Sequence, residues 1–262
     1  MDLLTIKPNI LLHQGKTYGE PIIEIAHLSK SFGDNLVLKD YSLTIRRGEN
    51  VVVLGKSGCG KSVMIKCIVG LLNYDGGSLK VFGKEISELS HHDLDELRAK
   101  IGFVFQSSAL YDSMTVRENL EFALRRHGKG KSKSEVNALT EATLNNVGLA
   151  HAVELMPSEL SGGMRKRIGL ARSLILEPEI MLYDEPTTGL DPITAREISN
   201  LMLQIQLKYN TSSIIITHDM HCAQVTANRL SLMLDGINYA EGTFNEMKSI
   251  RDPKVQSFFE SS

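Results

Sequence analysis

A glycine-rich loop between an apolar run and a helical run constrains the fold of this 262-residue chain more than any other feature. The loop, Gly55–Ser62, matches the pattern G-x-x-x-x-G-K-[ST]; it follows Val51–Leu54 and precedes Val63–Val69. Glycines let the backbone curl so that successive N–H groups point at one anion, and the helix N-terminus adds its partial positive charge. The sequence therefore predicts a phosphate-binding loop, in which Lys61 reaches the β- and γ-phosphates and the Ser62 hydroxyl binds Mg²⁺.

Every residue of this loop is a candidate nucleotide ligand, because a phosphate cradle is built mainly from backbone amides. The set is Gly55, Lys56, Ser57, Gly58, Cys59, Gly60, Lys61 and Ser62.

A second, mostly apolar run, Ile180–Glu185, ends in two adjacent acids. Such a run suits a buried strand whose carboxyl end delivers Asp184 to Mg²⁺. Glu185 then leaves the strand and can polarise an attacking water. An ordinary strand that ends in surface acids is the alternative that this run alone leaves open.

The segment Leu160–Met164 precedes a helical run. Ser161 is a good N-cap, and Gly162 and Gly163 leave backbone N–H groups uncovered. Taken alone, the segment is also compatible with a plain helix cap.

Together these residues resemble the ATP-binding cassette (ABC) ATPases, from about Ile22 to Gly242. Two positions depart from the usual pattern: Met164 stands where the signature usually ends in glutamine, and Phe32 stands where tyrosine is usual. The resemblance implies these roles: Phe32 stacks on adenine, Gln106 is the Q-loop glutamine, Leu160–Met164 is the signature, Glu185 is the catalytic glutamate, Gly189–Asp191 is the D-loop, and His218 is the switch histidine.

The resemblance also implies a P-loop NTPase fold of the ABC type: α/β, with a RecA-like parallel core, an antiparallel β subdomain and a helical subdomain. The expected parts are an N-terminal extension (1–20), a nucleotide-binding core (21–106 and 177–245), a helical subdomain (107–176) and a C-terminal tail (246–262). The tail predicts a short helix with an exposed aromatic pair, Phe258 and Phe259, which either packs on its own domain or contacts a second copy.

The family arrangement implies a head-to-tail homodimer that encloses two ATP molecules. The P-loop binds one side of each nucleotide, and Ser161, Gly162 and Gly163 of the second copy close the other side. The implied cofactors are ATP and Mg²⁺. The candidate metal ligands are Ser62, Gln106 and Asp184, and the candidate catalytic residues are Glu185, His218 and Gln106.

Composition limits the partners. The net charge is −2, which predicts no bulk attraction to nucleic acid, and no apolar run approaches the ~20 residues of a membrane span. Membrane association is therefore expected through a partner, at the cytoplasmic face of the inner (plasma) membrane. The paired His91 and His92 are interpreted as surface residues at a helix start rather than a metal site.

Within the family, the run Met156–Met164, the segment Gly189–Thr194 and the tail are most similar to the ATPases of bacterial Mla/MCE-type phospholipid transport. That resemblance implies an integral permease and an MCE-type lipid-binding protein as partners. Leu110 and Tyr111 then either dock a permease helix or belong to the core of the helical subdomain. Two alternatives stay open: another importer or exporter, such as one for amino acids or metals, and a soluble ABC ATPase in cofactor assembly or repair.

Overall fold

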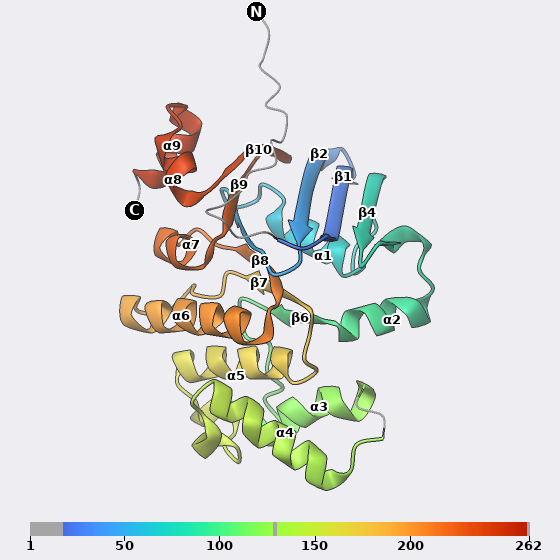
Figure 1. Ribbon diagram of the computed structural model, residues 1–262, viewed down its shortest axis with the longest axis vertical. Coiled ribbons are helices and arrows are strands. Elements are labelled where there is room, and N and C mark those ends of the chain that lie inside the picture. The colour runs from blue at the N-terminus through green and yellow to red at the C-terminus, as the bar shows by residue number, and fades with distance from the viewer. Residues whose placement is uncertain (1–17, 128–129, 261–262) are drawn as a thin grey trace, which may run out of the picture.

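The computed structural model describes residues 18–127 and 130–260, so the expected N-terminal extension lies almost entirely outside the described residues. Within these ranges a ten-stranded sheet has the order β5-β4-β1-β2-β10-β9-β3-β8-β7-β6. Helices cover the sheet and form a separate group beyond its β6 edge (Figure 1).

The parallel half of the sheet is the centre of the molecule. Its strands are β3 (Asn50–Leu54), β6 (Ile101–Val104), β7 (Ile180–Asp184), β8 (Ser212–Ile216) and β9 (Arg229–Leu234). They pair in parallel in the order β9-β3-β8-β7-β6, with Val52 opposite both Ile215 and Leu230. Every residue of β3 and β8 is buried, which explains their near-continuous apolar sequences. The predicted RecA-like parallel core is confirmed.

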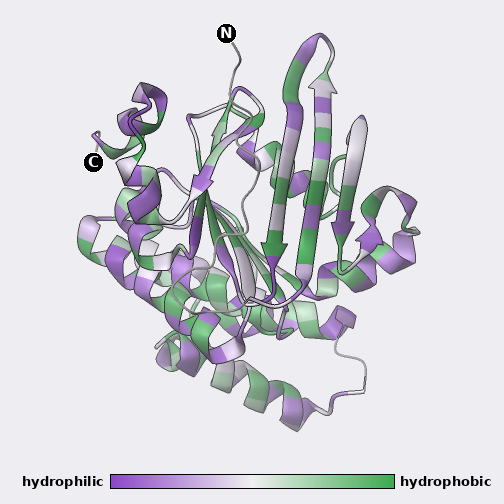
Figure 2. Cartoon of the chain, turned by 45° about the horizontal axis from the view of Figure 1, so that its top comes forward, coloured by the Kyte–Doolittle hydropathy of each residue, from purple (hydrophilic) through white to green (hydrophobic). Residues whose placement is uncertain are grey.

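Alternate residues of these strands enter two apolar clusters on opposite faces of the sheet, as the two-residue period of a strand requires. Val52, Leu54 and Ile215 belong to one cluster, whereas Val51 and Val53 belong to the other. Figure 2 shows hydrophobic residues concentrated in the central strands, while the peripheral helices carry both kinds of residue.

The predicted antiparallel region is also confirmed. It contains β1 (Pro21–Phe32), β2 (Asn35–Arg46), β4 (Gly76–Val81) and β5 (Lys84–Glu85). Strand β1 pairs antiparallel with β2 and β4, and β10 (Ile237–Gly242) joins this region to β9. Strand β1 is long because partners on both sides, β2 and β4, continue its hydrogen bonding.

Helices α1 (Lys61–Ile68), α2 (His91–Ala99), α6 (Pro192–Tyr209) and α7 (Met220–Thr226) follow or connect the strands of the core. Helices α3 (Val116–His127), α4 (Lys133–Asn146) and α5 (Gly162–Leu174) pack on one another, and α5 also contacts β6 and α6. Short 3₁₀ turns lie at Ile86–Glu88, Ala150–Ala152 and Pro157–Glu159. In the part of the chain that the structure describes, no helix is long and apolar enough to cross a bilayer.

The chain ends in two short helices, α8 (Phe244–Ser249) and α9 (Pro253–Phe259). The expected boundary between core and tail, at 245/246, falls inside α8. The predicted helix at the tail is present, but its aromatic pair is not exposed: Phe258 and Phe259 are half-buried against the core cluster. The Phe259 ring meets the edge of Phe244 at a centroid distance of 5.5 Å. The aromatic pair thus packs on its own domain.

Candidate active site

The carboxyl ends of neighbouring parallel strands meet at one edge of the sheet, which is where α/β folds place ligands. There β3 leads into the glycine loop, β6 into Gln106, β7 into Glu185 and β8 into His218. A cleft of about 1030 Å³ lies at this edge. Its lining includes Phe32, Val37, Gly55, Lys56, Ser57, Gly58, Gly60, Lys61, Ser62, Val63, Gln106, Asp184, Glu185, Thr188, Ile216, His218, Ser257 and Phe258.

The loop conformation requires glycine, as Gly60 and Gly55 show in two different ways. Gly60 has a φ of +111°, in the left-handed region, and caps α1 without any side chain. A Cβ on Gly55 would lie 2.6 Å from the Cys59 sulfur and 2.6 Å from the Met233 carbonyl oxygen. Both glycines therefore keep the backbone curled tightly enough for its amides to face an anion.

Lys61 is buried inside this loop. Its ammonium donates hydrogen bonds to the carbonyl oxygens of Gly55, at 2.6 Å, and Lys56, at 3.0 Å. The ammonium is thus held inside the phosphate-binding loop, at the N-terminus of α1. A polyphosphate in the cleft offers stronger, charged acceptors to the same ammonium.

Ser62 and Asp184 bring oxygen atoms together beside Lys61. The Ser62 hydroxyl lies 3.4 Å from the Asp184 carboxylate. Burial raises the pKa of Asp184 above its ordinary value, the bond from Ser62 acts in the opposite direction, and the charge of Glu185 raises it further. Hydroxyl and carboxylate oxygens are ligands that Mg²⁺ prefers, and a nearby cation would offset the cost of burying the Asp184 charge. These residues therefore fit the metal. Gln106, the other candidate metal ligand, lines the same cleft with an exposed side chain.

Glu185 lies just beyond β7 in a backbone conformation that non-glycine residues seldom adopt, with a φ of +50°. Its N–H donates to the Ile216 carbonyl oxygen at 2.9 Å, which fixes the turn. Its carboxylate lies 2.8 Å from Nδ1 of His218 and accepts a 3.1 Å hydrogen bond from the Thr188 hydroxyl. The structure therefore brings the two candidate catalytic residues into direct contact.

Thr188 was missed by the sequence argument. A hydroxyl residue three positions after an acid, in a turn, is a common partner for that acid and was the available signal.

The opposite end of the cleft is aromatic. Phe32, at the end of β1, is 48% exposed, and the Lys30 ammonium lies over its ring at 5.5 Å from the centroid. Val37 packs beside Gly60 below it. Ser257 and Phe258 of α9 also line the cleft. The sequence argument had interpreted the aromatic tail only as a packing or dimer element, because nothing in a linear sequence places the C-terminal helix near the glycine loop.

The signature residues lie away from this cleft. The Ser161 hydroxyl accepts a hydrogen bond from the Met164 N–H at 3.2 Å and so caps α5, while Ser161 and Gly162 are exposed. A Cβ on Gly163 would lie 2.7 Å from the side chain of Thr194, at the start of α6. The structure thus separates the signature from the chain's own P-loop.

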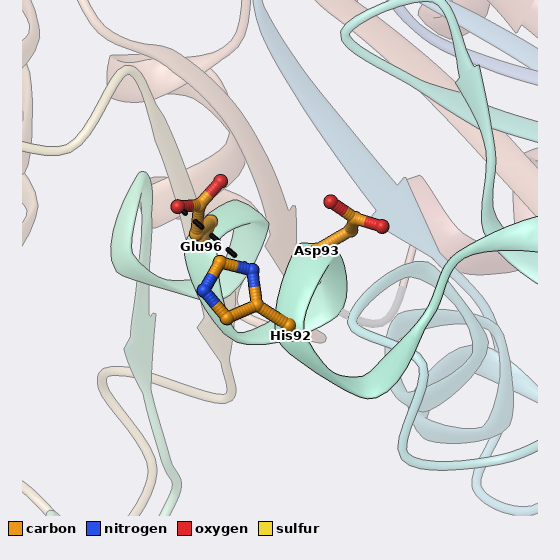
Figure 3. Close-up of side chains that lie close together, drawn as sticks. All are labelled: His92, Asp93 and Glu96. Atoms are coloured by element: carbon orange, nitrogen blue, oxygen red, sulfur yellow. Dashed lines mark ion pairs between the residues drawn. The ribbon is translucent and has the colours of Figure 1, made fainter.

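One group of potential metal ligands lies outside the cleft, on α2. The donor atoms of His92, Asp93 and Glu96 lie within 4.8 Å of one another (Figure 3). Asp93 accepts a 2.6 Å hydrogen bond from the Ser90 hydroxyl, which lowers the pKa of Asp93, and Ser90 caps the helix in return. His92 and Glu96 form an exposed pair one helical turn apart, at 4.0 Å. Helix capping and surface pairing account for this arrangement.

Comparisons with known proteins agree with this geometry. The family model described as "ABC transporter" matches residues 38–188, more than half of the chain. The chain is 40% identical over 248 residues to the "Probable ribonucleotide transport ATP-binding protein mkl" of Mycobacterium tuberculosis, covering 94% of this chain and 69% of that protein. It is 40% identical to "Protein TRIGALACTOSYLDIACYLGLYCEROL 3, chloroplastic" of Arabidopsis thaliana, covering 90% of this chain and 73% of that protein.

A third relative is the "Methionine import ATP-binding protein MetN" of Campylobacter jejuni, with 36% identity over 92% of this chain and 76% of that protein. Among solved structures, the dimeric post-hydrolysis state of the ATP-binding cassette MJ0796, bound to ADP and Pi, superposes with a TM-score of 0.76 at 30% identity. That superposition covers 84% of this chain and 98% of the other. The chain belongs to the ABC transporter family and is its ATP-binding, ATP-hydrolysing component.

Proposed function

We propose that this ATPase powers the transport of phospholipid, together with an integral permease and an MCE-type lipid-binding protein, from the cytoplasmic face of the inner membrane. The observation that carries the catalytic part of the proposal is the convergence of Lys61, Asp184, Glu185 and His218 on one cleft.

In the proposed mechanism, the P-loop amides and Lys61 hold the β- and γ-phosphates, and Phe32 stacks on adenine. Glu185 positions and deprotonates the attacking water, because its carboxylate lines the cleft and lies 2.8 Å from His218 Nδ1. His218 orients that carboxylate and the γ-phosphate.

Ser62 and Asp184, with Gln106, would hold Mg²⁺, which supplies charge neutralisation at the transferred phosphoryl group.

The enzyme is proposed to act as a head-to-tail pair. The exposed Ser161 and Gly162 of one copy would close over the nucleotide held by the P-loop of the other. The dimeric structures of MJ0796 support a pair of cassettes as the working unit. ATP would hold the pair shut and hydrolysis would let it open, which gives the permease a motion to use.

The permease contact is proposed at the segment after Gln106. Tyr111 is 43% exposed and its ring lies 4.9 Å from that of Phe122, which is 40% exposed. Exposed aromatic rings of this kind are typical anchors of interfaces. Leu110, the other residue predicted to dock the permease, packs against the apolar cluster that contains Val52 and residues of α3, α4 and α5. The docking role is therefore assigned to Tyr111 and Phe122.

Lipid as the cargo rests on the resemblance of Met156–Met164 and of the tail to Mla/MCE-type ATPases, and on the glycolipid in the name of the Arabidopsis relative. A different importer is the second candidate, because a methionine importer is 36% identical over most of the chain. Purification with the chain's own permease, followed by ATPase assays, separates them. Stimulation by phospholipid vesicles supports lipid transport, whereas stimulation only by methionine and its binding protein supports the second candidate.

Glu185→Gln tests the catalytic assignment. The variant should bind ATP and accumulate as an ATP-bound dimer on size-exclusion chromatography, because an amide of the same shape cannot accept the proton from water. Its hydrolysis rate should fall by about 10²-fold or more. Turnover near the wild-type rate would remove Glu185 as the base.

A further inference from the structure

Lys166 is a buried cation that neither the family motifs nor the proposed mechanism uses. It lies on α5, five residues after Ser161, and only 6% of it is exposed. Its ammonium donates a 2.5 Å hydrogen bond to the Gln106 carbonyl oxygen and lies 3.5 Å from the Glu185 carbonyl oxygen. One side chain thus contacts the backbone of both segments that carry the proposed metal and water-activating groups.

Burying an ammonium group lowers the stability of the fold unless hydrogen bonds or an opposite charge compensate for its lost hydration. Burying an ammonium favours its neutral form, and this burial lowers the pKa of Lys166, while the charges of Glu185 and Asp184 act in the opposite direction. Methionine or leucine would fill the same space without that cost. The position lies on the buried face of α5, three and four residues before Gly169 and Leu170, so packing alone would favour an apolar residue.

Helix α5 contacts both β6 and the segment that follows it along its length. A Cβ on Gly169 would lie 3.3 Å from the Ser108 side chain, and Ser173 donates a 2.8 Å hydrogen bond to the Phe103 carbonyl oxygen. Arg172 donates a 2.6 Å bond to the Ala109 carbonyl oxygen. Lys166 differs from these residues of α5 because its ammonium also lies near the Glu185 carbonyl oxygen. Because a helix is stiff over a few turns, its N-terminus and Lys166 move together.

We propose that Lys166 is a positioning residue that couples the two nucleotide sites of the dimer: it ties the signature helix to the backbones of Gln106 and Glu185. This proposal rests on the catalytic and signature roles proposed above. When Ser161 engages the nucleotide of the second copy, α5 is fixed, and Lys166 then holds Gln106 and Glu185 of its own chain in the hydrolytic arrangement. Each copy would thereby sense, through one side chain, whether the other site is closed.

The test compares Lys166→Met with Lys166→Arg and with Arg172→Met. Methionine keeps the apolar stem and removes the donor, and arginine keeps a charged donor. Arg172→Met removes a cation from the same helix that also binds a carbonyl of the segment after Gln106 but does not contact Glu185. For each purified protein, kcat, KM for ATP, the Hill coefficient of ATP hydrolysis and the melting temperature are measured. Hydrogen exchange of residues 185–188 is followed as a readout that does not depend on activity.

Lys166→Met should lower kcat at least about tenfold with KM within about threefold of wild type, and should lower the Hill coefficient, because positioning is lost while binding is kept. Exchange at 185–188 should rise in Lys166→Met only, and Lys166→Arg should recover most of kcat. Unchanged kcat and exchange in Lys166→Met would overturn the proposal. Equal losses of kcat and melting temperature in Lys166→Met and Arg172→Met would assign Lys166 a merely structural role, which also overturns it.

Glu185→Gln, measured beside these variants, separates the two levels of the argument. If it stops hydrolysis and Lys166→Met does not, only the positioning role fails. If Glu185→Gln itself hydrolyses ATP normally, the proposed catalytic assignment fails first.

Discussion

The P-loop edge of the sheet is assembled around one cleft within a single chain, whereas the signature segment lies away from that cleft. Lys61, Asp184 and His218 are far apart in sequence, yet adjacent parallel strands end at the same edge and place them around one cleft. Ser161 is much closer in sequence to Asp184, yet it is exposed at the start of α5 and does not line that cleft. The lesson is that strand ends, not sequence spacing, assemble the P-loop side of the site. In the proposed head-to-tail pair, the signature of a second copy supplies the other side.

Complementation between two inactive variants tests this contrast with the largest expected effect. Lys61→Ala should remove the phosphate cation, and Ser161→Arg should block the surface that closes over the second copy's nucleotide. Each variant alone should lose at least about 10²-fold in ATPase activity. Mixed after exchange of subunits, they form heterodimers in which one composite site is intact, so activity should return to about a quarter of wild type at most.

The control for this experiment is Lys61→Ala mixed with Lys61→Ala, which can assemble no intact site. If the mixture of the two different variants stays as inactive as each alone while heterodimers are detected, the signature does not act across the dimer.

The same contrast marks how far the sequence could be read. The Gly55–Ser62 loop and the acids Asp184 and Glu185 were predictable, because glycine loops and apolar strands ending in carboxylates follow from local chemistry. The Thr188 contact was overlooked although it is local, since a hydroxyl three residues after an acid commonly bonds that acid. The Lys166 contacts were not predictable, because they depend on how α5 packs against the segment after β6 and the turn after β7. Packing of Phe258 on its own domain was one of the two alternatives that the sequence left open. Its place in the lining of the cleft was not predictable, because that depends on how the C-terminal helix packs on the core.

Asp184→Asn should raise the melting temperature of the nucleotide-free protein at pH 7, while it weakens the binding of MgATP. Because burial raises the folded-state pKa of Asp184, ionising it costs more in the fold than in the unfolded chain. This group therefore lowers stability as pH rises through the interval between the two pKa values, and the full loss is present above the folded-state value. The neutral asparagine removes that loss, so at pH 7 the melting temperature should rise by about 1–3 °C.

Two further measurements complete this test. Near pH 3, where Asp184 is protonated in both states, the difference between Asp184→Asn and wild type should disappear. At pH 7, MgATP should raise the melting temperature of wild type far more than that of the variant, since a metal ligand is lost. A variant that melts below wild type at pH 7 would mean that the Ser62 contact outweighs the cost of burying the charge.

The smallest effects are expected at the proposed permease contact, which lies outside both the P-loop edge and the signature segment. Leu110 packs against buried apolar residues of the cluster that contains Val52 and residues of α3–α5. Tyr111 is more exposed; its ring contacts Phe122 and lies 5.7 Å from the Arg172 guanidinium. Leu110→Glu should therefore lower the melting temperature by several degrees, because it places a charge against apolar neighbours. Tyr111→Glu should change the melting temperature by less than about 2 °C and leave ATP affinity intact, yet reduce capture of the permease in a pull-down. Normal capture by Tyr111→Glu would place the permease contact elsewhere, and an equal fall in melting temperature for both variants would make Tyr111 part of the helical core.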